Sequence, residues 1–243
     1  MPDTPLAPAA ERERGYALFR IEAFSDAVFG FALTLLVVSL DVPKSAAELF
    51  ATMRGFVAFG VCFAFLAMLW CEHNRYFKRY PLSDVRTVAL NMLLLFVVLL
   101  YVYPMKFLFT QLTDAWLWGV PGSAIKSSDD VRQLMQIYGL GFFAINAVLY
   151  LMHRHAWNKR AELELTAASL ATLRGSLRRN IYSAAIAVVS VCIARFTSDA
   201  GLLAGLCYST LGFIEPLNAR ITVKARRAAE AAMASQHATE SVA

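Results

Sequence analysis

The chain has 243 residues, of which 58% are hydrophobic and 17% are charged, and its mean hydropathy is +0.51. A soluble domain is nearer ~45–50% apolar and ~25% charged, so these values argue against an ordinary soluble domain and exclude a disordered chain. Four cysteines in a chain of this length exclude a disulfide scaffold, and because they form no C-x-x-C pair they give no support for a zinc-type cluster.

Apolar residues come in runs that are long enough to cross a membrane. A helix needs ~20 mostly apolar residues to cross ~30 Å of hydrocarbon. The sequence predicts six spans, at residues 19–40, 55–71, 87–105, 134–152, 180–194 and 200–214. We therefore expect an all-α membrane protein with a transmembrane domain over residues 16–224, a cytoplasmic N-terminal tail over 1–15 and a cytoplasmic C-terminal tail over 225–243.

The basic residues predict the orientation of these spans. Lys and Arg prefer the cytoplasmic side of short loops, and they cluster in residues 75–86, 154–179 and 220–227. The intervening loops have fewer basic residues, and acidic residues offset them. This pattern predicts that both termini are cytoplasmic, and we expect the protein to lie in the cell inner membrane. The net charge of +5 is then a topology signal, and because the basic residues are divided among loops, no nucleic-acid partner is expected.

Polar residues at the start of the first span need an explanation, because charges in a membrane helix are costly. The segment 20–26 reads Arg-Ile-Glu-Ala-Phe-Ser-Asp, and an apolar run over 27–38 follows it. Asp26 lies about two turns inside the helix, where it must meet hydrogen-bond donors or stand in water. The residues alone leave two interpretations open: a polar network that locks helices together, or an ion or proton site.

The pattern Arg-x-x-x-Phe-Ser-Asp, formed by Arg20, Phe24, Ser25 and Asp26, resembles the start of the first helix in the transmembrane protein 175 family of potassium channels. The resemblance extends to residues in the second and third spans, namely Trp70, His73, Phe77, Leu90, Asn91 and Pro104. It implies a subunit with six transmembrane helices. It further implies that four identical subunits form a homotetramer around a central pore, lined by helix 1, that passes potassium ions.

The expected pore face of the first helix is apolar. Phe31, Leu35 and Val38 are spaced i, i+4 and i+7, so they share one face, and Thr34 is adjacent to it. By resemblance, these positions form a bulky constriction and a threonine ring. An apolar neck can gate by dewetting, and it favours potassium modestly because potassium holds its water less tightly than sodium. The sequence has no T-V-G-Y-G filter, and Phe31 stands where relatives carry Ile or Leu.

Asp26 is about 140° around the helix from Phe31 and therefore lies off this face. We assign the remaining polar and aromatic motif residues to a structural polar network, in which His73 and Asn91 are the expected partners of the first-helix group. The network consists of Arg20, Phe24, Ser25, Asp26, Trp70, His73 and Asn91.

Other functions are weighed against a channel. A proton- or cation-coupled secondary transporter that uses Asp26 is the main alternative, although such transporters usually have broken helices and internal repeats, and the sequence indicates neither. An intramembrane enzyme would need a G-x-S-x-G or H-E-x-x-H motif or paired aspartates, and none occurs. We therefore expect no enzymatic activity and no cofactor. A non-conducting scaffold stays open, because a ring of four Phe31 side chains would narrow the pore.

Overall fold

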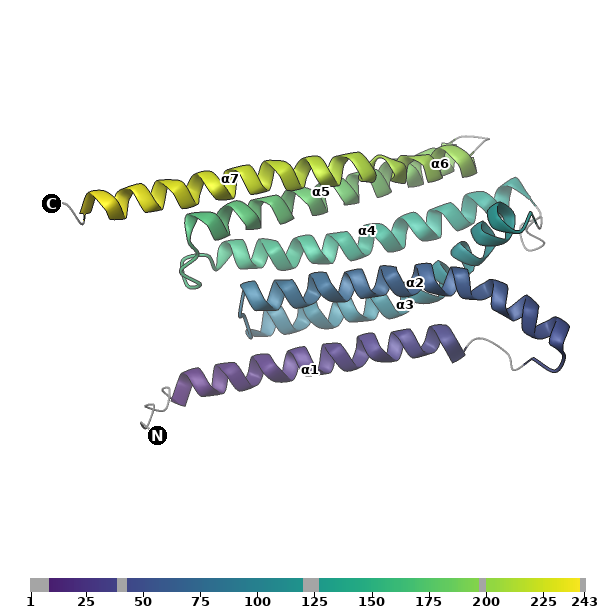
Figure 1. The fold of residues 1–243 in the computed structure, drawn as a ribbon, viewed down its shortest axis with the longest axis horizontal. Coiled ribbons are helices and arrows are strands. Elements are labelled where there is room, and N and C mark those ends of the chain that lie inside the picture. The colour runs from purple at the N-terminus through teal and green to yellow at the C-terminus, as the bar shows by residue number, and fades with distance from the viewer. Residues whose placement is uncertain (1–8, 39–42, 120–126, 197–199, 241–243) are drawn as a thin grey trace. The chain divides into compact units, whose positions relative to one another are not determined.

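The computed structural model describes residues 9–38, 43–119, 127–196 and 200–240, and these contain helices and no strands. The all-α fold expected from the sequence is therefore confirmed. Within these residues, seven helices follow one another (Figure 1): α1 (Ala9–Val38), α2 (Ala46–Arg79), α3 (Val85–Leu117), α4 (Ser128–Asn158), α5 (Ala167–Phe196), α6 (Ala200–Ser209) and α7 (Leu211–Glu240). They divide into two units, residues 1–121 and 122–243, which we describe separately.

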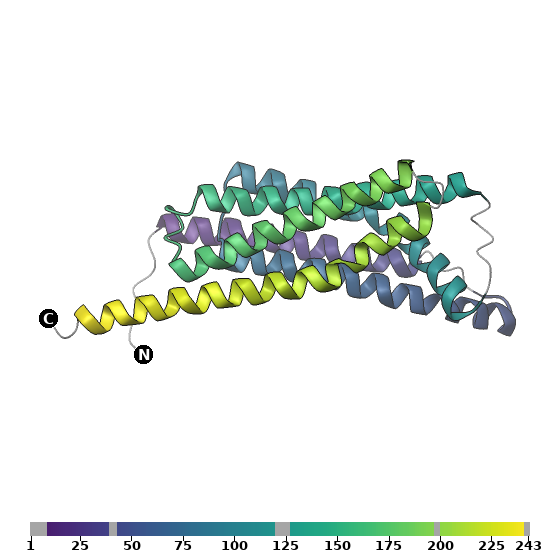
Figure 2. The same ribbon diagram turned by 90° about the horizontal axis from the view of Figure 1, so that it is seen from above.

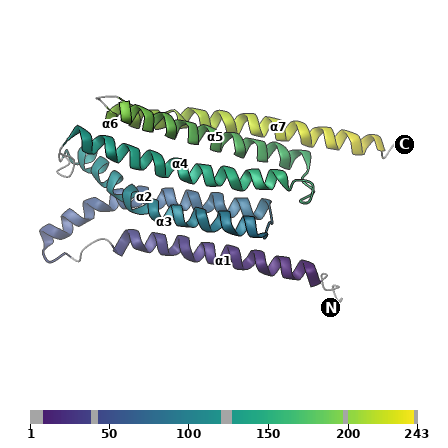
Figure 3. The ribbon, with the colours of Figure 1, turned by 180° about the vertical axis from the view of Figure 1, so that it is seen from behind.

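In the first unit, α2 and α3 form a helical hairpin, and α1 packs along both of them (Figures 1 and 3). The connection between α2 and α3 is short because each end is capped locally. The Tyr80 backbone N–H donates to the Tyr76 carbonyl at 2.9 Å, and the Asp84 carboxylate accepts from the Thr87 backbone N–H at 2.7 Å. An Asp at this position satisfies one of the free N–H groups at the start of a helix. The hairpin thereby fixes the ends of α2 and α3 that pack beside α1.

In the second unit, α5 packs against α4, α6 and α7. Helix α4 starts with a capping box, in which the Ser127 hydroxyl accepts from the Asp130 backbone N–H at 3.1 Å and the Asp130 carboxylate accepts from the Ser127 N–H at 3.0 Å. The last turns of α7 run past the end of the α4–α5 hairpin (Figures 1 and 2). This end of α7 therefore lacks a neighbouring helix in its own unit.

Four of these helices, α2, α3, α4 and α5, are long and apolar enough to cross a membrane. Helix α1 carries Arg20, Glu22 and Asp26 in its apolar part, and α6 has only 10 residues. The predicted span 200–214 is interrupted at Thr210, whose hydroxyl bonds to the Cys207 carbonyl. Helix α1 begins at Ala9 and α7 continues to Glu240, so both helices extend into the stretches expected to be tails.

Candidate functional site

Helix α1 has one fully buried face, which packs against α2 and α3. Its members are Ile21, Ser25, Phe29, Ala32 and Leu36. They are separated by four, four, three and four residues, the spacing that places side chains on one side of a helix. The position of α1 beside the hairpin is therefore set by this stripe, which is apolar except for Ser25.

A chain of hydrogen bonds joins all three helices of the first unit at Ser25. The Ser25 hydroxyl donates to the Ile21 carbonyl at 2.8 Å and accepts from Asn91 Nδ2 at 2.9 Å. Asn91 Oδ1 lies 2.7 Å from Nε2 of His73. Because Asn91 presents its oxygen to the histidine, Nε2 must carry the hydrogen and donate it. The three side chains are buried and belong to α1, α3 and α2, so the chain of bonds ties the helices to one another.

Aromatic rings enclose His73 on two sides. Its ring centroid lies 5.6 Å from that of Phe29 on α1 and 4.9 Å from that of Phe77, one turn further along α2. Rings at such distances exclude water, and buried polar groups without water depend on one another for hydrogen bonds. If Ser25, Asn91 or His73 lost its partner, no water could therefore replace it. The protein would then lose the full free energy of leaving a buried polar group unpaired.

The other motif residues of the expected polar network lie outside this chain of bonds. Asp26 Oδ1 accepts from Trp70 Nε1 at 2.7 Å as a separate pair between α1 and α2. Arg20 places its guanidinium 5.9 Å from the Tyr16 ring centroid, and Phe24 is exposed. Adjacent residues of a helix point about 100° apart, so Ser25 and Asp26 meet different neighbours.

The opposite face of α1 is exposed within the subunit. Phe31 is 59% exposed and Leu35 is 43% exposed, whereas Leu36, one residue further, is 1% exposed. Thr34 is also exposed, and its hydroxyl donates to the Phe31 carbonyl at 2.7 Å. The side chain of Val38 lies outside the described part of the structure. Phe31, Thr34 and Leu35 thus form an exposed and largely apolar face, with Phe24 one heptad before Phe31.

One residue that sequence reasoning missed acts on the end of this helix. Lys106 of α3 donates from Nζ to the Leu36 carbonyl at 3.0 Å. The last four carbonyls of a helix lack an intrahelical partner, and a cation stabilises that end of the helix dipole. The predicted third span, residues 87–105, stops one residue before Lys106. The available signal was the apolar run Phe107-Leu108-Phe109, which continues the helix.

Among the described residues, no group of three or more His, Cys, Asp or Glu side chains could hold a metal ion. These residues therefore give no support for a metal site. Helix α1 instead has two faces of different character. One face is fastened to its neighbours by hydrogen bonds, and the other presents bulky apolar side chains to the outside of the subunit.

Comparison with known proteins decides the family. The chain is 36% identical, over 187 residues, to a protein of Marivirga tractuosa named "Potassium channel"; the match covers 74% of this chain and 76% of that protein. The chain belongs to the TMEM175 family. Residues 20–101 match this family, described as endosomal/lysosomal potassium channel TMEM175, and they include α1 from Arg20 onward, α2 and the first half of α3.

Further similarities agree with this assignment. A Streptomyces collinus protein named as a potassium channel is 33% identical over 101 residues, which are 39% of this chain and 49% of that protein. A crystal structure of a variant of the potassium channel MtTMEM175, in complex with a nanobody–MBP fusion protein, has a TM-score of 0.75 and 34% identity; the match covers 84% of this chain and 93% of that one. A TMEM175 homologue from Chamaesiphon minutus, at 22% identity and a TM-score of 0.55, supports the fold.

Membership in the TMEM175 family, together with the four apolar helices, makes the chain a multi-pass membrane protein. The family consists of ion channels, so the expectation that the chain is not an enzyme is confirmed.

Proposed function

We propose that the chain forms a potassium-permeable cation channel in which four identical subunits surround a pore lined by α1. The named function of its relatives supports this proposal. The observation that carries it is the exposed face of α1, because a helix whose other face is fully buried leaves Phe31 and Leu35 uncovered. Four copies of such a face, pointing inward, would be covered by one another and would enclose an apolar path.

In this proposal, Phe31, Thr34, Leu35 and Val38 form the constriction. Bulky apolar side chains hold little water, so the neck opposes ions until it widens or becomes wet. The hydroxyl of Thr34 would supply the one ring of oxygen atoms in it. Selectivity would then come from the cost of removing water from the ion, because the sequence contains no T-V-G-Y-G filter.

The proposed topology has six spans, with both termini in the cytoplasm. Helix α1 supplies the first span, and α2 to α5 supply the next four. We assign the sixth to α6 together with the first turns of α7, since residues 200–221 are mostly apolar apart from Glu215 and Arg220. The sixth span is thus composed of two helices that meet at Thr210.

Ion flux tests the proposal. Purified protein in liposomes should pass potassium down its gradient, and more slowly sodium, without any need for a second gradient. Leu35→Asn should raise the flux and weaken the preference for potassium, because polar atoms at the neck hold water. The matched control is Leu100→Asn on α3, where the same type of side chain is 66% exposed on another helix.

Two results would overturn the proposal. Equal effects of the Leu35 and Leu100 variants would show that α1 does not line the path. Potassium movement that requires a proton gradient and stops in Asp26→Asn would instead indicate the coupled transporter, with Asp26 as its ion or proton site.

A further inference from the structure

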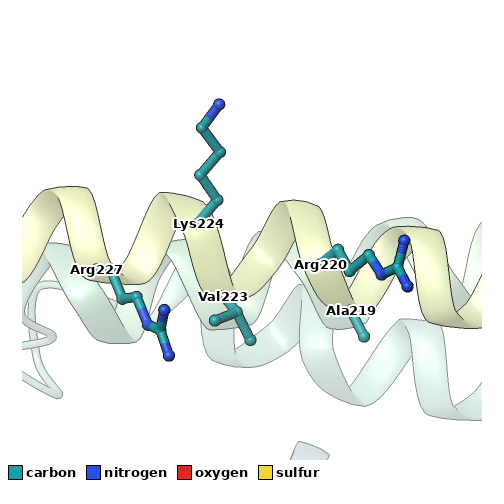
Figure 4. A pocket seen from close by; sticks show the side chains of 5 residues that line it. All are labelled: Ala219, Arg220, Val223, Lys224 and Arg227. Atoms are coloured by element: carbon teal, nitrogen blue, oxygen red, sulfur yellow. The ribbon is translucent and has the colours of Figure 1, made fainter.

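The exposed side of α7 contains a shallow concavity of about 410 Å³. It is lined by Ala219, Arg220, Val223, Lys224 and Arg227. In Figure 4, Arg220 and Arg227 stand on either side of Val223, Ala219 lies next to Arg220, and Lys224 extends away on the other side of the helix. The concavity therefore has an apolar floor between two guanidinium groups, and no acidic side chain lines it.

The two arginines continue an apolar line along α7. Phe213, Arg220 and Arg227 are seven residues apart, and residues two turns apart lie almost in line on a helix. Phe213 is 81% exposed and Leu217, one turn before Arg220, is 58% exposed. The exposed side chains on this line thus change from apolar to basic toward the C-terminus of α7, where the helix leaves the proposed sixth span.

No acidic side chain among the described residues neutralises the charge of this line. Arg220 and Arg227 have no ion pair there, whereas the neighbouring Arg226 is paired with Glu230 at 3.3 Å. Two unpaired guanidinium groups are therefore exposed on this line.

The opposite face of α7 holds this line in place. Arg178 of α5 donates from Nε to Asn218 Oδ1 at 2.6 Å, and Asn218 Nδ2 donates to the Gly175 carbonyl at 3.1 Å. Because these bonds fix the rotation of α7 against α5, the face with Arg220 and Arg227 points away from α5.

We propose that this face of α7 binds the headgroup of an anionic phospholipid, with the acyl chains along Phe213 and Leu217. A phosphate between Arg220 and Arg227 would be about 5 Å along the helix axis from each Cα, since seven residues rise about 10 Å. That separation is within reach of a long arginine side chain, and guanidinium groups bind phosphate oxygens in a bidentate manner. The proposal depends on α7 leaving the membrane at this point and not on ion conduction.

Thermal unfolding of the detergent-solubilised full chain tests the proposal. Titration with dioctanoyl phosphatidylglycerol should raise the midpoint, and dioctanoyl phosphatidylcholine should not. Arg220→Gln with Arg227→Gln should weaken the phosphatidylglycerol response by about fivefold in concentration for each arginine removed. The matched control is Arg226→Gln, which removes the same charge from the neighbouring position that is paired with Glu230. Inorganic phosphate, added alone, separates a lipid site from a simple phosphate site.

The outcomes are distinct. A loss in Arg226→Gln as large as that in Arg227→Gln alone would overturn the proposal, since it would indicate general charge attraction. An equal response to both lipids, or full stabilisation by inorganic phosphate, would overturn it too. Arg227 lies beyond the contacts between Asn218 and α5. The single variant Arg227→Gln can therefore be used for the same lipid titration if the double variant does not fold. None of these measurements depends on whether the protein conducts potassium.

Discussion

Asn91 connects the side chains of two other helices through a single buried amide. Its Nδ2 donates to Ser25 on α1, and its Oδ1 accepts from His73 on α2. An amide suits this position because it offers a donor and an acceptor on opposite sides of one planar group. An aspartate there would lack the donor, and a leucine would lack both.

Asn91→Leu keeps the approximate volume and removes both bonds. We expect it to lower the free energy of unfolding by about 1–3 kcal/mol, because the buried Nε2–H of His73 loses its acceptor. Ser25→Ala should also destabilise the protein, but Asn91→Leu with Ser25→Ala should cost little more than Asn91→Leu alone. Unfolding in detergent measures all three variants. Fully additive losses would show that Ser25 and Asn91 act independently.

The pair of Asp26 and Trp70 leads to a different expectation. Asp26→Ala removes the acceptor of Trp70 Nε1 and should lower the share of protein that assembles into the proposed tetramer, at a cost of about 1 kcal/mol because the pair is exposed. The ratio of potassium to sodium flux should not change, since Asp26 lies off the face of Phe31. Asp26→Asn keeps an oxygen acceptor and should assemble normally. Normal assembly of Asp26→Ala with altered selectivity would instead assign Asp26 to permeation.

At the scale of helices, α1 is held at two levels. The bonds around Ser25 fix its middle to α2 and α3, and Lys106 of α3 holds its last turn through the Leu36 carbonyl. Helix ends unravel more easily than helix middles, because their terminal carbonyls have no partner within the helix. The end of α1 that follows Leu35 thus depends on a side chain from another helix.

Lys106→Met should loosen this end of α1. A cation at a helix C-terminus contributes about 0.3–1 kcal/mol, so deuterium uptake by residues 33–38 should rise about two- to fivefold. Lys106→Arg should keep the contact and serve as the control. Unchanged exchange in Lys106→Met would show that the contact does not stabilise the helix end.

The contact between α5 and α7 gives a sharp steric prediction. A Cβ atom built on Gly175 would lie 2.6 Å from Thr222 Cγ2 and even closer to its hydroxyl, so the Thr222 side chain or the helices must shift in Gly175→Ala. We expect a loss of about 1–3 kcal/mol in unfolding stability. Gly212→Ala in α7 is the control, because nothing lies within 4 Å of the added atom. Stability that does not fall in Gly175→Ala would mean that α5 and α7 are not closely packed there.

For the molecule as a whole, hydropathy and charge predicted the all-α class, and the first-helix motif predicted the family. Hydropathy did not predict where helices end. Helix α3 continues 12 residues past Met105, to Leu117, and it includes polar residues such as Thr113, whose hydroxyl bonds to the Phe109 carbonyl one turn before at 2.9 Å. Hydropathy also predicts residues 200–214 as one span, because the break at Thr210 does not change the apolar composition of the segment.

The site was predicted in part for a related reason. The contacts of Ser25 with Asn91 and of Asn91 with His73 join residues that are 66 and 18 positions apart. Only the resemblance brought these residues together beforehand. The separate pairing of Asp26 with Trp70, and of Lys106 with Leu36, depends on which neighbour each side chain meets, which composition and spacing do not specify.

The topology can be tested on the whole chain. Reporters fused after Ala243 and inserted in the connection between α4 and α5 should report the cytoplasmic side, and a reporter between α3 and α4 should report the opposite side. The reason is that basic residues are concentrated in the first two regions. The same side for all three insertions would exclude the six-span arrangement.

The bonds around Ser25 also bear on how protons are handled. A proton moves through a hydrogen-bonded wire only if each member can accept one proton and release another. Here the donors all run one way, from His73 through Asn91 and Ser25 to the Ile21 carbonyl. An amide nitrogen has no free electron pair with which to take up a proton. Asn91 therefore cannot relay a proton. The buried chain of hydrogen bonds can hold the middle of α1 against α2 and α3 without conducting protons between the helices.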